Sequence, residues 1–302
     1  MPIPEGKTLL TTYEEEVKSK PPSDVSQIQP CTHEEADSRM MLHAWHAYQQ
    51  GYRSIVIHAT DTDVVVLAIA MASIMDGCAM WLAFGHGNYF RHIAAHTIAT
   101  HIGPERSWGL LFLHTVSGCD TVSAICGIGK KTVWSIWNSM PNLGEVFNHL
   151  SHAPAEVTDD DMDNIERFFV VLYSRTSPLK KVNEARKQLF AQGNRQSENI
   201  PPTKEALRQH VKRAVFQAGH IWGQSQIANP ELPSPADWGW AKNADDVWHP
   251  FWTVMPEASK GCRELIKCKC KKRCAGNCKC SAANLPCTEL CFCSGQCFRD
   301  EQ

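Results

Sequence analysis

The sequence has no marked excess of charge of one sign, no long uninterrupted hydrophobic run, and no internal repeat or low-complexity tract. Its 302 residues carry 30 Lys and Arg against 32 Asp and Glu, a formal net charge of -2. Attraction to a polyanion must therefore come from a local patch. The most apolar stretch, Val64 to Phe84, is interrupted at Asp76-Gly77, well short of the roughly 20 residues that a membrane span needs. No membrane helix is expected.

The first residues also lack the basic, apolar and small-residue pattern of a secretory signal. This absence favours an intracellular protein, whose cysteines stay reduced unless a metal holds them. With 43% hydrophobic and 21% charged residues, the chain has enough apolar side chains for one core of domain size and an appendage.

Helix and strand patterns alternate in the first half of the chain. Residues 32 to 51 have an N-cap residue at Thr32, acids in the first turn and apolar residues at helical spacing, and they stop at Gly51. The short runs RSIVIHAT and AMWLAF predict buried strands. Between them, DVVVLAIAMASIM predicts a strand that runs into a helix. This succession predicts an α/β fold with a parallel sheet and covering helices.

Helical patterns dominate from Arg91 onward, with a break at Gly103-Pro104. Residues 159 to 173, 181 to 193 and 203 to 222 predict three further helices, the first with an acid-rich start. From Asn229 to Pro256 the chain is rich in Pro and Trp. It predicts a strap that docks its tryptophans on a neighbouring surface, with base stacking as the less favoured alternative.

These patterns divide the chain into four regions. They are an incomplete α/β region (1–140), a helical extension (141–228), a Pro/Trp-rich linker or strap (229–260) and a small cysteine-rich module (261–300).

Five acids lie near the predicted carboxyl ends of strands, where functional groups are found in open α/β sheets. Glu35 and Asp37 begin a predicted helix, Asp61 and Asp63 follow a predicted strand, and Asp120 lies in a Ser-Gly-Cys turn. If these carboxylates converge, their mutual repulsion favours a hard divalent cation. Two Mg²⁺ or Mn²⁺ ions about 3.5 to 4 Å apart can polarise a phosphodiester and activate water.

A Gly-Ile-Gly-Lys-Lys run follows Asp120. Gly127 and Gly129 allow close approach of the backbone to a phosphate, a helix starting near Lys130 directs free N–H groups outward, and Lys131 adds charge. This run predicts a grip on a nucleic-acid backbone that does not read bases. The alternative is a tight turn before a solvated basic helix.

The order EEAD, TDTDVVVLA and GCDTVSAICGIGKK resembles the internal region of flap-endonuclease-type structure-specific nucleases, members of the PIN-like superfamily. The resemblance covers about residues 32 to 140. It implies a PIN-like parallel sheet and a hairpin that holds duplex backbone, often with a monovalent cation such as K⁺. It also implies metal-ligand roles for Glu35, Asp37, Asp61, Asp63 and Asp120, and backbone binding by Gly127, Gly129 and Lys130.

The family builds the other side of its metal site from an N-terminal region with further aspartates. Here only about thirty residues precede the first motif, and no Asp ends the run GKTLLTTYEEEV. Three explanations are open: the sequence is part of a longer protein, a partner supplies the other half, or catalysis has been lost.

The C-terminal end carries nine closely spaced cysteines, here called the cysteine tail, with Cys262 just upstream. Repeated Cys-x-Cys spacing in an intracellular chain favours zinc over disulfides. About three Zn²⁺ ions would need three bridging sulfurs. Nearby Lys and Arg offset the negative charge of such a cluster. The predicted ligands are Cys268, Cys270, Cys274, Cys278, Cys280, Cys287, Cys291, Cys293 and Cys297.

This spacing resembles the tesmin-type CXC domain, a three-zinc fold of nuclear DNA-binding and chromatin proteins. Members of that family often place a tyrosine before the fourth cysteine, where it enters the minor groove. Here Asn277 precedes Cys278, so the sequence does not favour base-selective binding by this module.

The leading hypothesis is a divalent-metal-dependent, structure-specific DNA nuclease with a zinc-binding DNA-interaction tail. One alternative is a catalytically inactive nucleic-acid or chromatin-binding protein that uses the cysteine tail and the Gly-Ile-Gly-Lys-Lys hairpin. Another is a scaffold whose tail binds protein. The expected partners are the DNA backbone and a protein that completes the acidic site, and the expected location is nuclear or otherwise intracellular.

Overall fold

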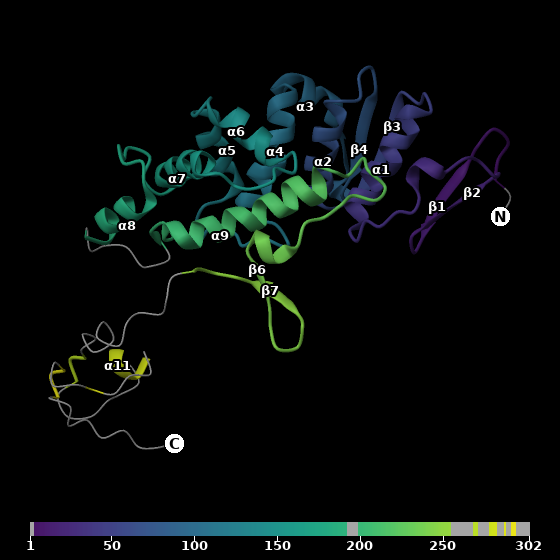
Figure 1. Ribbon diagram of the computed structural model, residues 1–302. Coiled ribbons are helices and arrows are strands. Elements are labelled where there is room, and N and C mark those ends of the chain that lie inside the picture. Colours follow the sequence, from purple (N-terminus) through teal and green to yellow (C-terminus); the bar gives the residue numbers. More distant parts are fainter. Residues whose placement is uncertain are drawn as a thin grey trace. The chain divides into compact units, whose positions relative to one another are not determined.

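The computed structural model describes residues 3–191, 199–254, 268–270, 278–282, 287 and 291–293. The chain divides into two units, Met1–Thr253 and Val254–Gln302, and each is described by itself (Figure 1). The first unit is mixed α/β, with small sheets and many helices. The second unit contains the cysteine tail and the short helix α11 (Lys279–Ala282).

The first unit opens with an antiparallel hairpin, in which Leu9 lies opposite Lys20. A three-stranded sheet follows in the order β3-β4-β5. The β3 and β4 strands are parallel, whereas β5 is antiparallel to β4. The sheet therefore contains one parallel and one antiparallel pair, and the PIN-like parallel sheet that the resemblance implies is not confirmed. The strands of the first unit are β1 (Leu9–Tyr13), β2 (Glu16–Lys20), β3 (Ser54–Ala59), β4 (Ala79–Phe84), β5 (Arg91–Ala94), β6 (Trp240–Lys242) and β7 (Trp248–Pro250).

Helices make up most of the rest, and Figure 1 shows α5 to α9 at the end of the unit opposite β1 and β2. Short 3-10 turns lie at Ser26–Ile28, Gly87–Tyr89 and Pro235–Trp238, and a π-helical segment, η4 (Phe216–Trp222), continues α9. The α-helices are α1 (Ala36–Gln49), α2 (Thr62–Ala72), α3 (Ala95–Ile102), α4 (Pro104–Val116), α5 (Lys130–Asn138), α6 (Leu143–Leu150), α7 (Asp159–Tyr173), α8 (Val182–Ala191) and α9 (Lys204–Val215).

Three local predictions are wrong. The DVVVLAIAMASIM run contains no strand, because α2 begins at Thr62 and the Asp61 side chain caps it by accepting from the backbone N–H of Asp63. A helix that is apolar on every side, as α2 is, must be buried, and periodicity alone does not separate it from a buried strand. The strand at Arg91–Ala94 falls in a segment predicted to be helical. Finally, α1 is capped at Glu35, and Thr32 instead donates to the side chain of Asn229.

The acid-rich start predicted at residue 159 is confirmed. The Thr158 hydroxyl accepts from the backbone N–H of Asp161, and the Asp161 carboxylate accepts from the backbone N–H of Thr158. This reciprocal capping satisfies two backbone donors that have no partner within the helix. The three acids in the first turn also interact favourably with the helix dipole.

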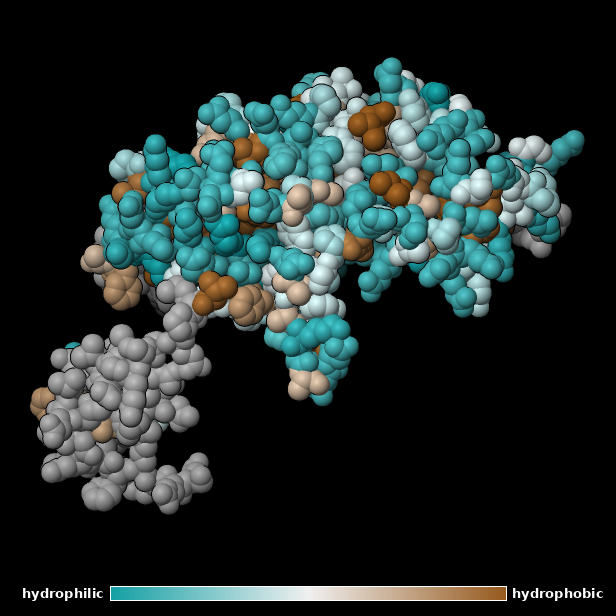
Figure 2. Space-filling model, viewed as in Figure 1, coloured by the Kyte–Doolittle hydropathy of each residue, from teal (hydrophilic) through white to brown (hydrophobic). Residues whose placement is uncertain are grey.

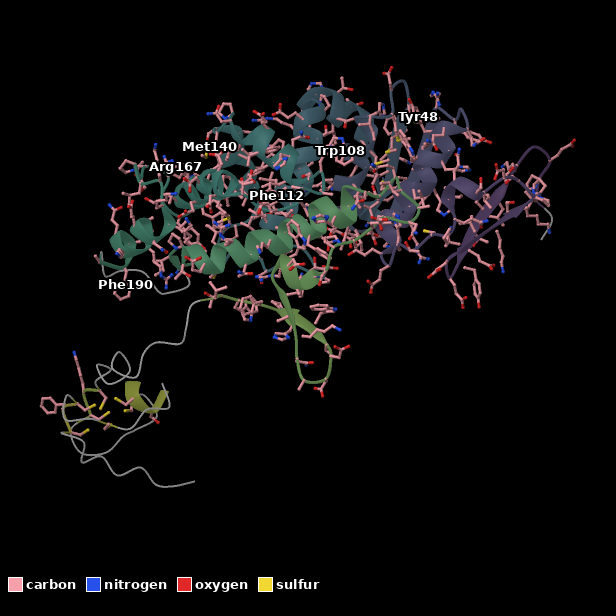
Figure 3. The ribbon with its side chains drawn as sticks, in the orientation of Figure 1. Tyr48, Trp108, Phe112, Met140, Arg167 and Phe190 are labelled. Atoms are coloured by element: carbon pink, nitrogen blue, oxygen red, sulfur yellow. The ribbon has the colours of Figure 1, made fainter. Side chains whose placement is uncertain are left out.

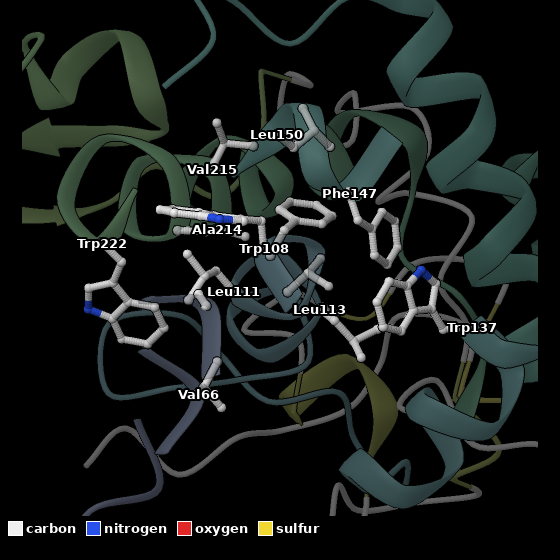
Figure 4. Close-up of a cluster of buried hydrophobic side chains, with 14 of the residues drawn as sticks. Val66, Trp108, Leu111, Leu113, Trp137, Phe147, Leu150, Ala214, Val215 and Trp222 are labelled. Atoms are coloured by element: carbon white, nitrogen blue, oxygen red, sulfur yellow. The ribbon is translucent and has the colours of Figure 1, made fainter. Parts of the chain in front are cut away.

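The centre of the first unit is α4, which packs against α2, α6 and α9. Gly109 lets α6 come close, because a Cβ at that position would lie 3.2 Å from the side chains of both Phe147 and Trp137. The Trp137 and Phe147 rings stack with their centroids 5.7 Å apart (Figure 4). Phe112 meets Phe147 edge to face at 4.9 Å. These contacts hold α4 within a continuous aromatic core.

The strap packs on α9 and η4. Trp238 is buried, and its ring lies 4.4 Å from that of His220. Arg213 donates to the backbone carbonyls of Gly239 and Phe251, and its guanidinium lies over Trp252. Docking of the strap is therefore confirmed at Trp238, whereas the β6–β7 hairpin that follows projects from the unit and leaves Trp252 exposed (Figure 1).

The visible face of the first unit is largely hydrophilic, and its hydrophobic side chains appear singly or in small groups (Figure 2). Among the described residues, no helix combines the length and the hydropathy that crossing a bilayer requires.

Replacing Phe147 with alanine should lower the free energy of unfolding by about 3 to 5 kcal/mol, because it removes a fully buried ring and leaves a cavity beside Trp137. The matched control is Phe190→Ala in α8, where the ring is 73% exposed (Figure 3). That change should cost less than about 0.5 kcal/mol. Urea unfolding of both variants measures the difference, and equal losses would contradict the proposed core.

Candidate functional site

The structure brings together the five predicted acids, here called the acid site. Glu35 is the N-cap residue of α1 and Asp37 lies in its first turn. Asp61 and Asp63 hold the same two positions on α2, directly after the carboxyl end of β3. Asp120 comes from the loop that joins α4 to α5. Two helix N-termini therefore face a group of carboxylates, an arrangement that their dipoles stabilise.

The convergence of these acids is visible in the electrostatics of Asp37. Its pKa rises from 3.8 to about 6, first because the carboxyl is partly buried and then because of repulsion from Asp61, Glu35, Asp63 and Asp120. All four other acids thus lie close enough to Asp37 to oppose its charge. The folded chain holds a concentration of negative charge that a cation would relieve.

Side-chain contacts hold two of the acids in place. Gln217 Nε2 donates to Glu35 Oε1 at 2.9 Å and to Oε2 at 3.1 Å, and Trp222 Nε1 donates to Glu35 Oε2 at 2.9 Å. His114 Nε2 lies 2.8 Å from Asp63 Oδ1 in a largely buried contact. Sequence reasoning missed these partners of the acid site. Gln217 and Trp222 lie more than 180 residues from Glu35 along the chain. No local sequence motif predicts that they contact this acid.

Carboxylates suit a hard divalent cation, and hydrogen-bonded ligand carboxylates are usual in such sites. Within the described part of the chain, however, the only residues whose ligand atoms all lie within 4.8 Å of one another in groups of three or more are cysteines. The acids therefore share one electrostatic field without forming a closed set of ligand atoms.

The Gly-Ile-Gly-Lys-Lys run lies at the start of α5. Gly127 adopts a positive φ of 69° in the turn, and Gly129 is the N-cap residue of α5 with open space where a side chain would stand. Lys131 is exposed. Their predicted contact with a nucleic-acid backbone stays a prediction.

Lys130 points back toward the protein. Its Nζ donates to the backbone oxygen of His114 at 2.8 Å, to Ser117 Oγ at 3.1 Å and to the backbone oxygen of Gly118. Its pKa is lowered because the ammonium is partly desolvated, an effect that nearby Cys119 and Asp63 oppose. Lys130 thus binds the C-terminal end of α4 and holds the loop that carries Asp120.

The cysteine tail contains two groups of thiols that can each hold a metal ion, because the sulfur atoms of each group lie within 4.8 Å of one another. One group is Cys268, Cys280, Cys287 and Cys291, and the other is Cys268, Cys270 and Cys278. The sulfurs of Cys280 and Cys291 lie 3.5 Å apart, and those of Cys268 and Cys287 lie 3.8 Å apart. A disulfide needs about 2.05 Å, whereas tetrahedral Zn²⁺ with bonds of about 2.3 Å separates its sulfurs by about 3.8 Å.

Cys268 belongs to both groups, which is the position that a bridging sulfur takes. The pKa of Cys270 rises to about 12 and that of Cys280 to about 11, because desolvation and neighbouring thiols disfavour the thiolate. A bound cation removes this penalty. The cluster therefore suggests a zinc module. Cys293 is buried nearby, and the predicted ligands Cys274 and Cys297, together with Cys262, lie outside the described residues.

Comparison with known proteins gives no match: no protein-family model, no curated protein and no solved structure is similar to this chain. The resemblances to flap-endonuclease-type nucleases and to tesmin-type domains therefore depend on the sequence motifs, and the structure adds only a cluster of cysteines that suggests a zinc module.

Asp37→Asn should stabilise the protein at neutral pH. Because the folded-state pKa of Asp37 is raised, the folded chain binds more protons than the unfolded chain between about pH 4 and pH 6. The stability that this group contributes is complete below the unfolded pKa and is lost as the pH rises through about 6. With allowance for solvent screening, the asparagine variant should gain about 1 kcal/mol at pH 7.5.

Urea unfolding at pH 4 and pH 7.5 measures this gain. The matched control is Asp245→Asn in the β6–β7 hairpin, where the aspartate is exposed, and it should change stability at neither pH. A gain in unfolding free energy of the same size at both pH values, or in both variants, would show that the other acids do not raise the pKa of Asp37.

Loss of Cys268 should remove more zinc than loss of Cys287, because Cys268 belongs to both thiol groups and Cys287 to one. Purified wild type should contain about three Zn²⁺ ions. Elemental analysis of Cys268→Ser, Cys287→Ser and the control Cys126→Ser, an exposed cysteine of the first unit, compares their zinc contents. Equal zinc in the Cys268 and Cys126 variants would exclude the tail as the zinc site.

Proposed function

We propose that the chain is a divalent-metal-dependent, structure-specific nuclease that hydrolyses phosphodiesters in DNA. The observation that carries this proposal is the convergence of carboxylates from α1, from the β3–α2 connection and from the α4–α5 loop, seen in the raised pKa of Asp37. Carboxylates that repel one another at the carboxyl end of a parallel strand are the ligand set that Mg²⁺ or Mn²⁺ takes in phosphodiester hydrolysis.

The acids would have different roles in such a metal site. Asp37, Asp61 and Asp120 would contribute metal oxygens, and Asp61 keeps its orientation because its Oδ1 accepts from the backbone N–H of Asp63 at 2.9 Å. Glu35 is fixed by Gln217 and Trp222, which leaves its charge unneutralised. Two bound ions would polarise the phosphodiester and lower the pKa of the attacking water.

The start of α5 would hold the nucleic-acid backbone. Gly127, Gly129 and Lys131 are exposed there, and the free N–H groups of a helix N-terminus favour an anion. Lys130, which is also exposed, would fix the loop through its Nζ contacts, and a monovalent cation such as K⁺ could bind at the turn. The zinc tail would add backbone affinity, consistent with a nuclear location, and a protein partner would supply further ligands to the acid site.

A second function is a non-catalytic nucleic-acid or chromatin-binding protein. One observation favours it: among the described residues, no three of the acids place their oxygens within 4.8 Å of one another. In that case the helix N-terminus and the cysteine tail bind DNA, and affinity falls steeply with salt without any metal-dependent cleavage.

Asp61→Asn should abolish Mn²⁺ binding at the acid site and lower the cleavage rate of a flap DNA at least about 100-fold, because it removes one charge and one oxygen ligand. It should leave DNA affinity within about twofold. Calorimetric titration of Mn²⁺ and a gel cleavage assay measure the two effects, with Asp245→Asn as the matched control. Unchanged cleavage by Asp61→Asn would refute the nuclease assignment, and DNA binding without cleavage by the wild type would favour the second function.

A further inference from the structure

A cavity of about 340 Å³ lies beside the acid site and shares Glu35 with it. Its walls come from the start of α1, from the π-helical segment η4 and from the strap. The side chains that shape it are Glu35, Phe216, Gln217, Ile221, Leu232 and Trp240. A volume of this size lies within the range of small-ligand sites.

The π-helical turn explains why the cavity exists. Ile221 follows Phe216 by five residues and Gln217 by four, about one π-helical turn, and all three side chains line the cavity. Single π-helical turns within α-helices occur frequently at functional sites. Here the turn directs an aromatic ring, an amide and an aliphatic side chain toward the same space.

The wall opposite η4 comes from the strap. Trp240 is half-buried in β6, where it lies opposite Pro250 of β7. Leu232 also lines the cavity although 51% of its surface is exposed, which places it at the mouth. The cavity therefore offers two large aromatic rings, Phe216 and Trp240, beside the aliphatic side chains of Ile221 and Leu232, and the rest of its lining is mostly polar or charged.

Polar groups at one side of the cavity are fixed. Glu35 is held by Gln217 and Trp222, and Gln217 Oε1 accepts from the Thr121 hydroxyl at 2.9 Å. Thr121 directly follows Asp120 in the chain and also lines the cavity. Carboxylate and hydroxyl oxygens in fixed positions can accept from the amino or imino groups of a planar heterocycle.

We propose that this cavity binds one unpaired nucleobase of a single-stranded nucleic acid, with its ring against Trp240 and Phe216 and its polar edge toward Glu35 and Thr121. This inference rests on the proposed function and deepens it, because it specifies the substrate. Shared use of Glu35 places the base next to the acids that would act on the neighbouring phosphate. A base inside a duplex cannot enter, so the chain selects single strands, frayed ends or flaps.

The test compares a short oligothymidylate with an abasic oligomer of equal length, by fluorescence anisotropy with the full chain and without added divalent metal. Both probes present the same phosphates, so the zinc tail and other backbone contacts contribute equally to the two affinities. The wild type should bind oligothymidylate about tenfold more tightly, because stacking of one base contributes on this scale. Equal affinities would overturn the inference.

Trp240→Ala should remove most of the preference for the thymidylate probe. The matched control is Trp248→Ala in the same hairpin, whose indole does not line the cavity and carries Lys242 over its ring. It should keep the tenfold preference. A preference that survives in Trp240→Ala, or that disappears equally in Trp248→Ala, would show that the base binds elsewhere. Leu232→Ala tests the mouth with a half-exposed side chain that folding does not need, and it should lower the preference about threefold.

Asp61→Asn separates this inference from the proposed function, because Asp61 does not line the cavity. The variant should lose the response to Mn²⁺ and keep the preference for bases. If the wild type cleaves DNA but shows no preference for bases, the proposed base-binding cavity is refuted and the proposed nuclease function is not. If the wild type shows the preference without any response to Mn²⁺, the base-binding cavity is supported and the nuclease function is refuted.

Discussion

The arrangement around the acid site depends on the burial of α4. This helix has neighbours on several sides, and Gly109 brings α6 close enough for Trp137 and Phe147 to pack against it. The packing of α4 also holds its C-terminal end in place, where two side chains bind backbone carbonyl oxygens of the last turn. Lys130 donates to the backbone oxygen of His114, and the half-buried His210 contacts that of Val116 at 2.8 Å. The loop that carries Asp120 therefore leaves a rigid support.

In the acid site, repulsion among the carboxylates is partly offset by the helix dipoles and by hydrogen-bond donors. The N-termini of α1 and α2 attract the carboxylates of Asp37 and Asp63 in their first turns, while burial and mutual repulsion raise the pKa of Asp37 to about 6. Gln217 and Trp222 hold Glu35 by neutral donors, which fix its position without neutralising its charge. Such a site is costly in the folded state and gains most from a cation, which is the physical reason to connect it with metal chemistry.

The two units owe their order to different interactions. The first unit has a continuous apolar core, whereas the described residues of the second unit are organised around thiols whose sulfurs are spaced for a tetrahedral ion. The strap packs on the core and also lines the cavity, because Trp238 docks on η4 while Trp240 forms part of the cavity wall next to Glu35. One Pro/Trp-rich segment thereby contributes both to packing and to the shape of this cavity.

The sequence by itself determined the helix that stops before Gly51, the strands Ser54–Ala59 and Ala79–Phe84, the helix Asp159–Tyr173 with its acidic start, and the acids and cysteines of the two candidate sites. These features depend on local periodicity, capping and cysteine spacing. Local signals misjudged α2, whose apolar surface on all sides hides its period, and β5, whose four residues form a strand only by pairing with β4. The inward turn of Lys130, the donors on Glu35 and the cavity beside it were decided by tertiary structure alone. They join residues far apart in the chain, and only the packing of α4, α9 and η4 places those residues within hydrogen-bonding distance.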